Sequence, residues 1–186
     1  MRVRTIAAST LALLFAITPI GAQADTPPAG EITCVGDTAS VNFKPGVGIL
    51  QTKQALSGKA DSTKCLPENP EVTFDRASVT VNGSADAKCL LLLGSIKASN
   101  EKLSGSVTWY ATDGSTATSS FTASTVDITD KGMVVQGQIT GGYQTGMKLD
   151  YSTVWNQPFF LDAVLRCATF KITTLKGDLT TLHVFP

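Results

Sequence analysis

Hydrophobic and polar residues alternate along most of this chain, from about residue 31 to its end. In the clearest stretch, the odd-numbered residues from Leu103 to Trp109 are apolar or glycine, and the even-numbered residues are serine or threonine. An alternation with a period of two predicts a β-strand with one buried face, here the face that carries Trp109. The same pattern predicts further strands over 31–36, 40–43, 48–57, 77–81, 116–122, 133–139, 147–152, 170–175 and 179–185.

Glycine, proline, asparagine and aspartate mark the connections between these strands, because they adopt turn conformations readily. Short strands at this spacing are typical of an antiparallel sandwich or barrel and argue against a βαβ fold. We therefore expect an all-β protein, specifically an antiparallel, immunoglobulin-like β-sandwich. We expect turns at Lys44-Pro45-Gly46, Asn82-Gly83, Asp113-Gly114, Asp130-Lys131-Gly132 and Lys176-Gly177-Asp178, a loop over Ser62–Pro70, and a wide hairpin loop over Gly141–Gly146.

Two stretches depart from the simple alternation. Lys88–Gly94 contains four consecutive leucines, which predicts a short central strand with both faces covered. After Pro158, the residues Phe160, Val164 and Cys167 recur at helical spacing, which predicts one or two helical turns. We therefore expect at most one short helix in the fold.

The N-terminus has the composition of a secretory signal peptide. Arg2 and Arg4 form a positively charged region, and an apolar core follows over 6–20. Ala22-Gln23-Ala24 fits the small-x-small cleavage pattern, and the apolar core is shorter than the roughly 20 residues that span a membrane. We expect residues 1–24 to be cleaved, 25–30 to form a flexible leader, and 31–186 to form a single domain that is secreted and extracellular.

The charge of the chain gives no sign of a nucleic-acid partner. The chain has 15 basic and 15 acidic residues, and the loss of Arg2 and Arg4 with the signal peptide would leave 13 basic residues. A slightly negative protein has no electrostatic attraction for nucleic acid or for an anionic membrane. We expect neither as a partner after signal cleavage.

All four cysteines, Cys34, Cys65, Cys89 and Cys167, lie in the part that we expect to be secreted. An even number of cysteines in an exported chain is typical of disulfides, and three pairings are possible. We favour Cys34–Cys65 and Cys89–Cys167, which would stabilise the fold by closing chain loops. No two cysteines are close in sequence and His183 is the only histidine, so we expect no metal site and no cofactor.

The sequence contains no recognisable catalytic group. His183 is the only candidate base, it alternates with Leu182 and Val184 in a predicted strand, and no G-x-S-x-G motif accompanies it. The aspartates are scattered in turns and beside strands, so their spacing predicts no catalytic pair of carboxylates. We therefore expect a protein that is not an enzyme.

Two aromatic residues are the best candidates for a contact surface, Tyr143 in the glycine-rich loop and Trp155 after a predicted strand. We expect a binding or interaction module whose partner is an extracellular protein or a cell-wall polymer. One alternative is an inhibitor of secreted proteases, which would present Lys64 on the Ser62–Glu71 loop. A second alternative is a small hydrolase that uses carboxylates or His183.

Several short motifs follow one another in a characteristic order, over nearly the whole of the expected secreted part. They are Cys34-Val35-Gly36, Lys44-Pro45-Gly46, Cys65, Lys88-Cys89-Leu90, Thr108-Trp109, Gly137-Gln138-Ile139-Thr140-Gly141-Gly142 and Cys167. In this order, the chain resembles small secreted actinobacterial β-rich proteins with four cysteines. Lys88 departs from the small residue usual in that group, and Val47-Gly48 departs from the leucine usual after the turn. The resemblance implies export, a β fold and disulfides, and it carries no catalytic residues.

Overall fold

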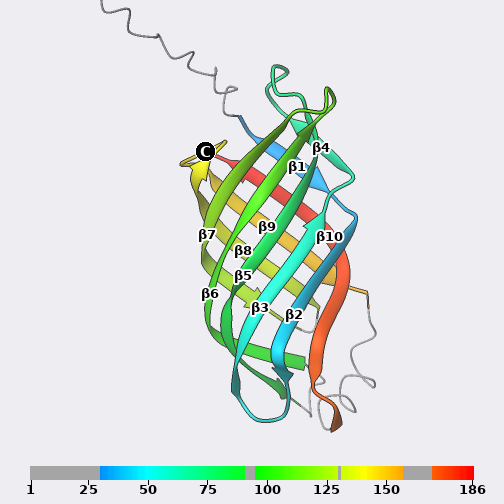
Figure 1. The fold of residues 1–186 in the computed structure, drawn as a ribbon, viewed down its shortest axis with the longest axis vertical. Coiled ribbons are helices and arrows are strands. Elements are labelled where there is room, and N and C mark those ends of the chain that lie inside the picture. Colours follow the sequence, from blue (N-terminus) through cyan, green and yellow to red (C-terminus); the bar gives the residue numbers. More distant parts are fainter. Residues whose placement is uncertain (1–29, 91–94, 130, 157–168) are drawn as a thin grey trace, which may run out of the picture.

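The computed structural model describes residues 30–90, 95–129, 131–156 and 169–186. The prediction of an antiparallel all-β protein is confirmed for these residues, because ten strands form one antiparallel sheet (Figure 1). The strands are β1 (Ile32–Val35), β2 (Thr38–Val47), β3 (Thr52–Asp61), β4 (Lys64–Pro67), β5 (Phe74–Leu90), β6 (Ser95–Ala111), β7 (Thr116–Ile128), β8 (Gly132–Gly142), β9 (Lys148–Trp155) and β10 (Ile172–Phe185).

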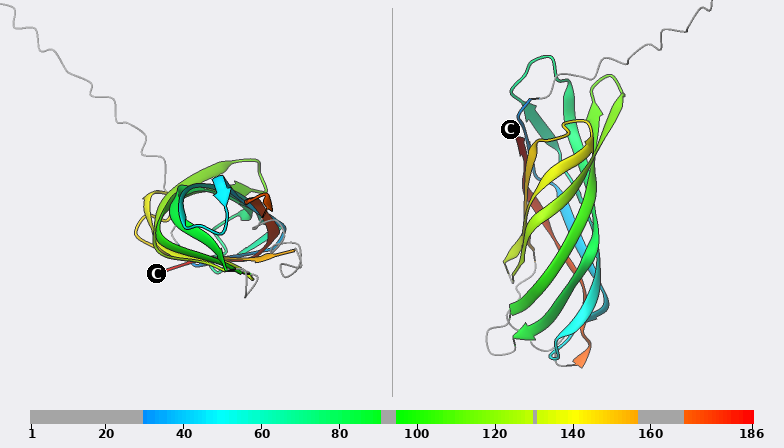
Figure 2. Two further views of the ribbon diagram at one scale, coloured as in Figure 1. Left: turned by 90° about the horizontal axis from the view of Figure 1, so that it is seen from below. Right: turned by 90° about the vertical axis from the view of Figure 1, so that its left-hand side faces the viewer.

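The sheet closes on itself, because β10 pairs with β9 along one edge and with both β1 and β2 along the other. Leu182 pairs with Cys34 of β1 and Leu175 pairs with Val41 of β2, so β1 and β2 follow one another along the same edge. In the same way, β4 pairs with β1 and β3 pairs with β2, so β4 and β3 share the next position around the sheet. The ten strands therefore occupy eight positions around an up-and-down barrel, which Figure 2 shows along its axis.

The expected immunoglobulin-like sandwich is not confirmed, because the described strands form one closed sheet instead of two sheets packed face to face. A sandwich needs connections that cross from one sheet to the other, whereas here consecutive strands from β5 to β10 pair with one another in a single sheet. Two of the strands, β5 and β6, are 17 residues long and coil around the barrel. The alternation of apolar and polar residues is the same for both architectures, so it could not distinguish them.

Two of the predicted turns lie inside strands. Asn82-Gly83 lies within β5 and Lys176-Gly177-Asp178 lies within β10. A Cβ atom at Gly83 would lie 2.0 Å from the Lys102 carbonyl oxygen, so glycine is required there for the close approach of β6. The two glycines therefore allow the tight coiling of the barrel wall instead of reversing the chain.

The other turn signals have mixed outcomes. Lys44-Pro45-Gly46 lies at the end of β2, with a cis Lys44–Pro45 peptide bond, and the reversal follows it over 48–51. Asp113-Gly114 forms the predicted turn. The predicted wide hairpin loop between β8 and β9 is confirmed over 143–147, whereas Gly141 and Gly142 belong to β8. Asp130 lies outside the described residues, and β8 begins at Gly132.

The predicted Cys34–Cys65 disulfide is confirmed. It joins directly paired residues of β1 and β4, so Lys64–Pro67 is a strand instead of the expected loop. Cys89 is buried in β5 and is not a free thiol. Its expected partner, Cys167, lies outside the described residues, and the second disulfide stays a prediction.

Two further predictions lie mostly outside the described residues. These are the strand over Lys88–Gly94, which is described only as far as Leu90, and the helical turns after Pro158. Among the described residues, no helix is long and apolar enough to cross a membrane.

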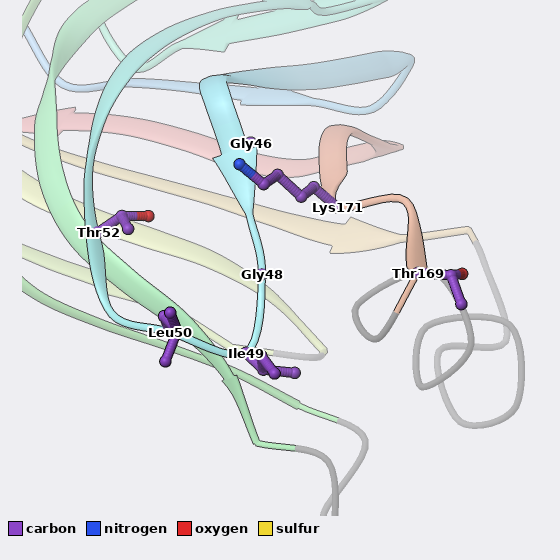
Figure 3. A pocket seen from close by; sticks show the side chains of 7 residues that line it. All are labelled: Gly46, Gly48, Ile49, Leu50, Thr52, Thr169 and Lys171. Carbon is purple, nitrogen blue, oxygen red and sulfur yellow. The ribbon is translucent and has the colours of Figure 1, made fainter.

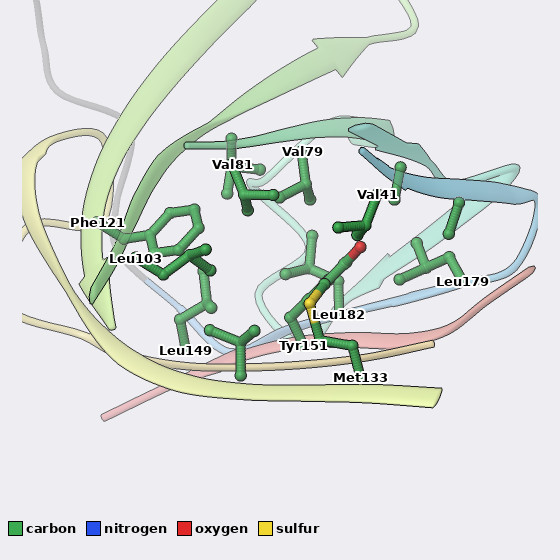
Figure 4. Close-up of a cluster of buried hydrophobic side chains, with 14 of the residues drawn as sticks. Val41, Val79, Val81, Leu103, Phe121, Met133, Leu149, Tyr151, Leu179 and Leu182 are labelled. Atoms are coloured by element: carbon green, nitrogen blue, oxygen red, sulfur yellow. The ribbon is translucent and has the colours of Figure 1, made fainter. Parts of the chain in front are cut away.

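Side chains fill the inside of the barrel. Every strand directs alternate residues inward, and Val41, Val79, Phe121, Tyr151 and Leu182 are each no more than 2% exposed (Figure 4). The predicted position of Trp109 in the core is also confirmed, because its side chain is fully buried. An eight-stranded barrel is just wide enough for such side chains to fill it. Because the inside is packed, the described hollows that could accept a ligand lie on the outer wall and at one end.

Candidate functional site

A polar hollow of about 550 Å³ lies on the outer wall, where two neighbouring strand positions are interrupted side by side. Gly36-Asp37 separates β1 from β2, and Ser62-Thr63 separates β3 from β4. The two interruptions are joined, because the Thr63 backbone N–H donates to the Gly36 carbonyl at 3.0 Å and the Thr63 hydroxyl donates to the same oxygen at 2.6 Å. The hollow therefore has a fixed shape.

Ser62 lines this hollow and continues the hydrogen bonding to β5 where the strand pairing is interrupted. Its backbone N–H donates to the Ala77 carbonyl at 2.8 Å, and its hydroxyl oxygen accepts a hydrogen bond from the Ala77 N–H at 2.7 Å. Ser62 itself is only 6% exposed. Because a side chain satisfies the buried backbone donor, the sheet can bend here without leaving that group unpaired.

Charged side chains of both signs form the walls. The Lys59 ammonium lies 3.0 Å from the Asp61 carboxylate, and both project from the end of β3. On the opposite wall, the guanidinium of Arg76 lies 5.7 Å from the centre of the Tyr110 ring. Asp37, from the interruption between β1 and β2, also lines the hollow. The site thus offers cationic, anionic and aromatic groups within one concave surface.

A second hollow of about 370 Å³ adjoins the first, and Lys59 and Asp61 line both. Ser40 of β2 pairs with Lys59 on one side and with Lys176 of β10 on the other, so these three outward side chains form a row across the wall. We call the two adjoining hollows the outer groove. Its charged members are Asp37, Lys59, Asp61, Arg76 and Lys176.

A different kind of cavity lies at the end of the barrel where β2 turns into β3 (Figure 3). It has a volume of about 220 Å³, and we call it the mouth cavity. Two of its lining residues, Ile49 and Leu50, are 49% and 74% exposed, which is unusual for large apolar side chains. Its lining consists of Gly46, Gly48, Ile49, Leu50, Thr52, Thr169 and Lys171.

Neither predicted aromatic contact residue is on the surface. Tyr143 is 5% exposed, and its ring packs edge-on against Phe74 at 5.0 Å between centres, so burial raises the pKa of the Tyr143 phenol. Trp155 is 6% exposed, and its indole N–H donates to the Thr129 carbonyl at 2.9 Å. The prediction that these two residues form an exposed contact surface is therefore wrong. Trp155 lies on the same face of β9 as Leu149, which is the inward face, and it packs into the core.

The groups expected for a hydrolase are not brought together by the described residues. His183 Nε2 lies 2.6 Å from the Glu31 carboxylate, and its ring stacks on Phe185. His183 is not among the residues that line the outer groove, where Asp37 and Asp61 lie. Within the described ranges, no group of three or more histidine, cysteine or acidic side chains could hold a metal ion.

The outer groove is not predictable from local patterns, because its residues come from five separate strands and from two interruptions. Nothing in the sequence distinguishes Lys59 and Asp61 from other exposed charged residues of a strand. The sequence carries one local sign of the two interruptions. Gly36-Asp37 and Ser62-Thr63 are short polar breaks, and the alternation of apolar and polar residues resumes after each of them. Comparison of the chain with known protein families, curated proteins and solved structures found no match.

Proposed function

We propose that this protein is a secreted, non-catalytic binding module, and that its outer groove holds an extended, charged ligand outside the cell. The ligand class is a cell-wall polymer or a segment of an extracellular protein. One observation carries this proposal: two adjoining hollows share Lys59 and Asp61 and form one concave surface with charges of both signs.

The dimensions of the outer groove favour an extended ligand. The groove crosses the outer wall from Lys176 on β10 through β2, β3 and β5 to Tyr110 on β6. Neighbouring strands are about 4.8 Å apart, so this path is on the order of 20 Å long. A chain with several repeating polar units would contact the whole path, whereas a small metabolite would contact only one hollow.

The charges of the outer groove favour a ligand that carries both signs. Lys176 has no ion-pair partner among the described residues, and the Lys59–Asp61 pair is largely exposed. Exposed pairs of this kind contribute little to stability, so their charges remain available to a ligand. An amphoteric polymer or peptide segment can pair with both signs, which gives orientation as well as affinity.

Covalent stabilisation suits a role outside the cell. The Cys34–Cys65 disulfide lies beside the interruption that forms the groove, and it limits movement of β1 relative to β4. We also propose the second disulfide, Cys89–Cys167, and the cleavage of residues 1–24. Disulfides persist in oxidising compartments, so the Cys34–Cys65 bond supports export.

The proposal is tested by co-sedimentation of the purified protein with insoluble cell walls and by affinity capture from culture medium. We expect retention at micromolar concentrations that falls as salt is raised, because exposed charges are screened. The Lys59→Gln/Arg76→Gln double variant should bind at least about tenfold more weakly, a loss of about 1.4 kcal/mol. The Lys102→Gln/Lys131→Gln variant removes two exposed lysines elsewhere and should bind normally. Equal retention of both variants, or no retained partner, would contradict the proposal.

A second candidate function, inhibition of secreted proteases, is favoured by β4. Lys64 and Leu66 are exposed on either side of the buried, disulfide-bonded Cys65, and β4 pairs with β1 along one edge only. An exposed, extended segment held by a disulfide in this way can enter the substrate groove of a protease. If the protein inhibits trypsin-like enzymes, Lys64→Ala should abolish inhibition while leaving binding to the outer groove unchanged.

A further inference from the structure

The wall of the mouth cavity consists mainly of apolar side chains and bare backbone, whereas the larger hollow of the outer groove has a mainly polar lining. Gly46 and Gly48 leave one side without side chains, and Ile49 and Leu50 form another (Figure 3). Phe170, which adjoins two lining residues in sequence, is 80% exposed. A cluster of exposed apolar residues around a cavity is typical of a binding site, and the mouths of β-barrels are common places for such sites.

A buried amide holds the wall of this cavity in place. The side chain of Gln54 is fully buried, and its Oε1 accepts a hydrogen bond from the Gly46 N–H at 2.8 Å. Its Nε2 donates to the Gly46 carbonyl at 3.2 Å and to the Thr52 hydroxyl at 2.7 Å. Gln54 thus links two residues that line the cavity. Gln54 therefore fixes the Gly46 and Thr52 side of the cavity, so a ligand would not have to order that side on binding.

Lys171 supplies the charged group among the described lining residues. Its backbone has a φ of 62°, in the left-handed region that non-glycine residues rarely adopt. In Figure 3 its side chain extends from the start of β10 toward Gly46. Among the described residues, no carboxylate lies within ion-pairing distance of Lys171. A lysine with no ion-pair partner among the described residues therefore lies at the edge of an apolar cavity.

We propose that the mouth cavity binds a fatty carboxylate, with the alkyl chain against Ile49 and Leu50 and the carboxylate on the Lys171 ammonium. An alkyl chain gains from leaving water for this apolar wall. A carboxylate is the head group that complements a single lysine, and the ligand's polar end would then face solvent. This site is separate from the outer groove and does not depend on the function proposed for it.

The proposal is tested by titrating the purified protein calorimetrically with decanoate, below the concentration at which decanoate aggregates, and with decanol in parallel. Lys171→Gln should weaken decanoate binding about fivefold and leave decanol binding unchanged, because only the carboxylate contacts the ammonium. Lys171→Arg should restore decanoate binding. A loss of both ligands in Lys171→Gln would indicate a structural role for the lysine and would overturn its assignment.

A second variant tests the cavity itself without removing a contact. A Cβ atom at Gly48 would lie 3.6 Å from Lys171 Cγ, which is an ordinary contact, so a side chain can be added there. Gly48→Leu should fill the cavity and weaken both ligands at least about tenfold, while Gly141→Leu at the other end of the barrel should not. Unchanged binding in Gly48→Leu would overturn the proposal. Binding to anionic vesicles with no binding of monomeric decanoate would overturn it also, in favour of a membrane surface.

Discussion

The inner and outer walls of the barrel are built from the same strands and follow different rules. In β3, Leu56 and Ala60 are at most 4% exposed and face the packed interior, whereas Lys59 and Asp61 line the outer groove. At inward positions the volume of the side chain is restricted, because added or removed atoms change the packing. Outward positions are limited mainly by charge and hydrogen bonding. The inner wall therefore determines the fold, and the outer wall is free to carry binding groups.

The inner wall should not accept even one added methyl group at its tightest points. A Cβ atom at Gly83 would lie 2.0 Å from the Lys102 carbonyl oxygen, and a backbone atom cannot move aside easily. We expect Gly83→Ala to lower the free energy of unfolding by about 3 kcal/mol or more, measured by denaturant titration. Gly141→Ala is the control, because nothing lies within 4 Å of the added atom. Similar stability of the two variants would contradict the close approach of β6 to Gly83.

The disulfide should have the next largest effect. Cys34–Cys65 closes a loop with a sequence separation of 31 residues. Replacing both cysteines by alanine should cost about 3–4 kcal/mol in free energy of unfolding, because the unfolded chain gains conformational freedom. Thermal unfolding of the variant and of the parent protein under oxidising conditions measures this loss. A change below about 1 kcal/mol would mean that the strand pairing of β1 and β4 alone holds this end.

A buried phenol should make the inner wall sensitive to alkaline pH. Tyr151 is 1% exposed, and burial raises the pKa of its phenol above the ordinary value of 10.0. Above pH 10 the unfolded chain loses this proton while the folded barrel retains it, so stability should fall as pH rises. Tyr151→Phe should reduce this fall by about 1 kcal/mol while changing stability little at neutral pH. Parallel alkaline denaturation curves for the two proteins would contradict the burial of this ionisable group.

The outer wall should give the smallest change in stability. Lys59 and Asp61 form an ion pair whose side chains are 60% and 37% exposed. Because exposed ion pairs contribute little, Lys59→Gln should change the free energy of unfolding by less than about 0.5 kcal/mol. Denaturant titration at neutral pH measures this difference. A loss comparable to that of Gly83→Ala would remove the distinction between the two walls.

The sequence predicted the strand content better than the arrangement of the strands. Alternation of apolar and polar residues identified most strands and the burial of Trp109, because side-chain parity in a strand is a local property. Closure of the sheet depends on pairing between β10 and β2, which are far apart in the chain, so local patterns could not reveal it. Gly83 shows the same limit, since a glycine after asparagine usually marks a turn, whereas here it admits a neighbouring strand.

The candidate site was harder to predict for a related reason. Aromatic residues in or beside loops often make contacts with partners, yet Tyr143 and Trp155 both belong to the core. The outer groove depends on two strand interruptions that lie side by side only once β1 has paired with β4 and β2 with β3. No spacing in the sequence brings Asp37, Lys59 and Arg76 together, and their exposed charges are common on any outer wall.

The most direct test of the account is to map a ligand on the outer wall. Isotope-labelled protein is titrated with soluble cell-wall fragments, and the shifts of backbone amide signals are followed by nuclear magnetic resonance. We predict shifts concentrated around Lys59, Asp61 and Arg76, with little change on the outer faces of β7 and β8, and loss of the shifts in Lys59→Gln/Arg76→Gln. Shifts centred on β7 and β8, or shifts that persist in the double variant, would contradict the assignment of the outer groove as the binding site.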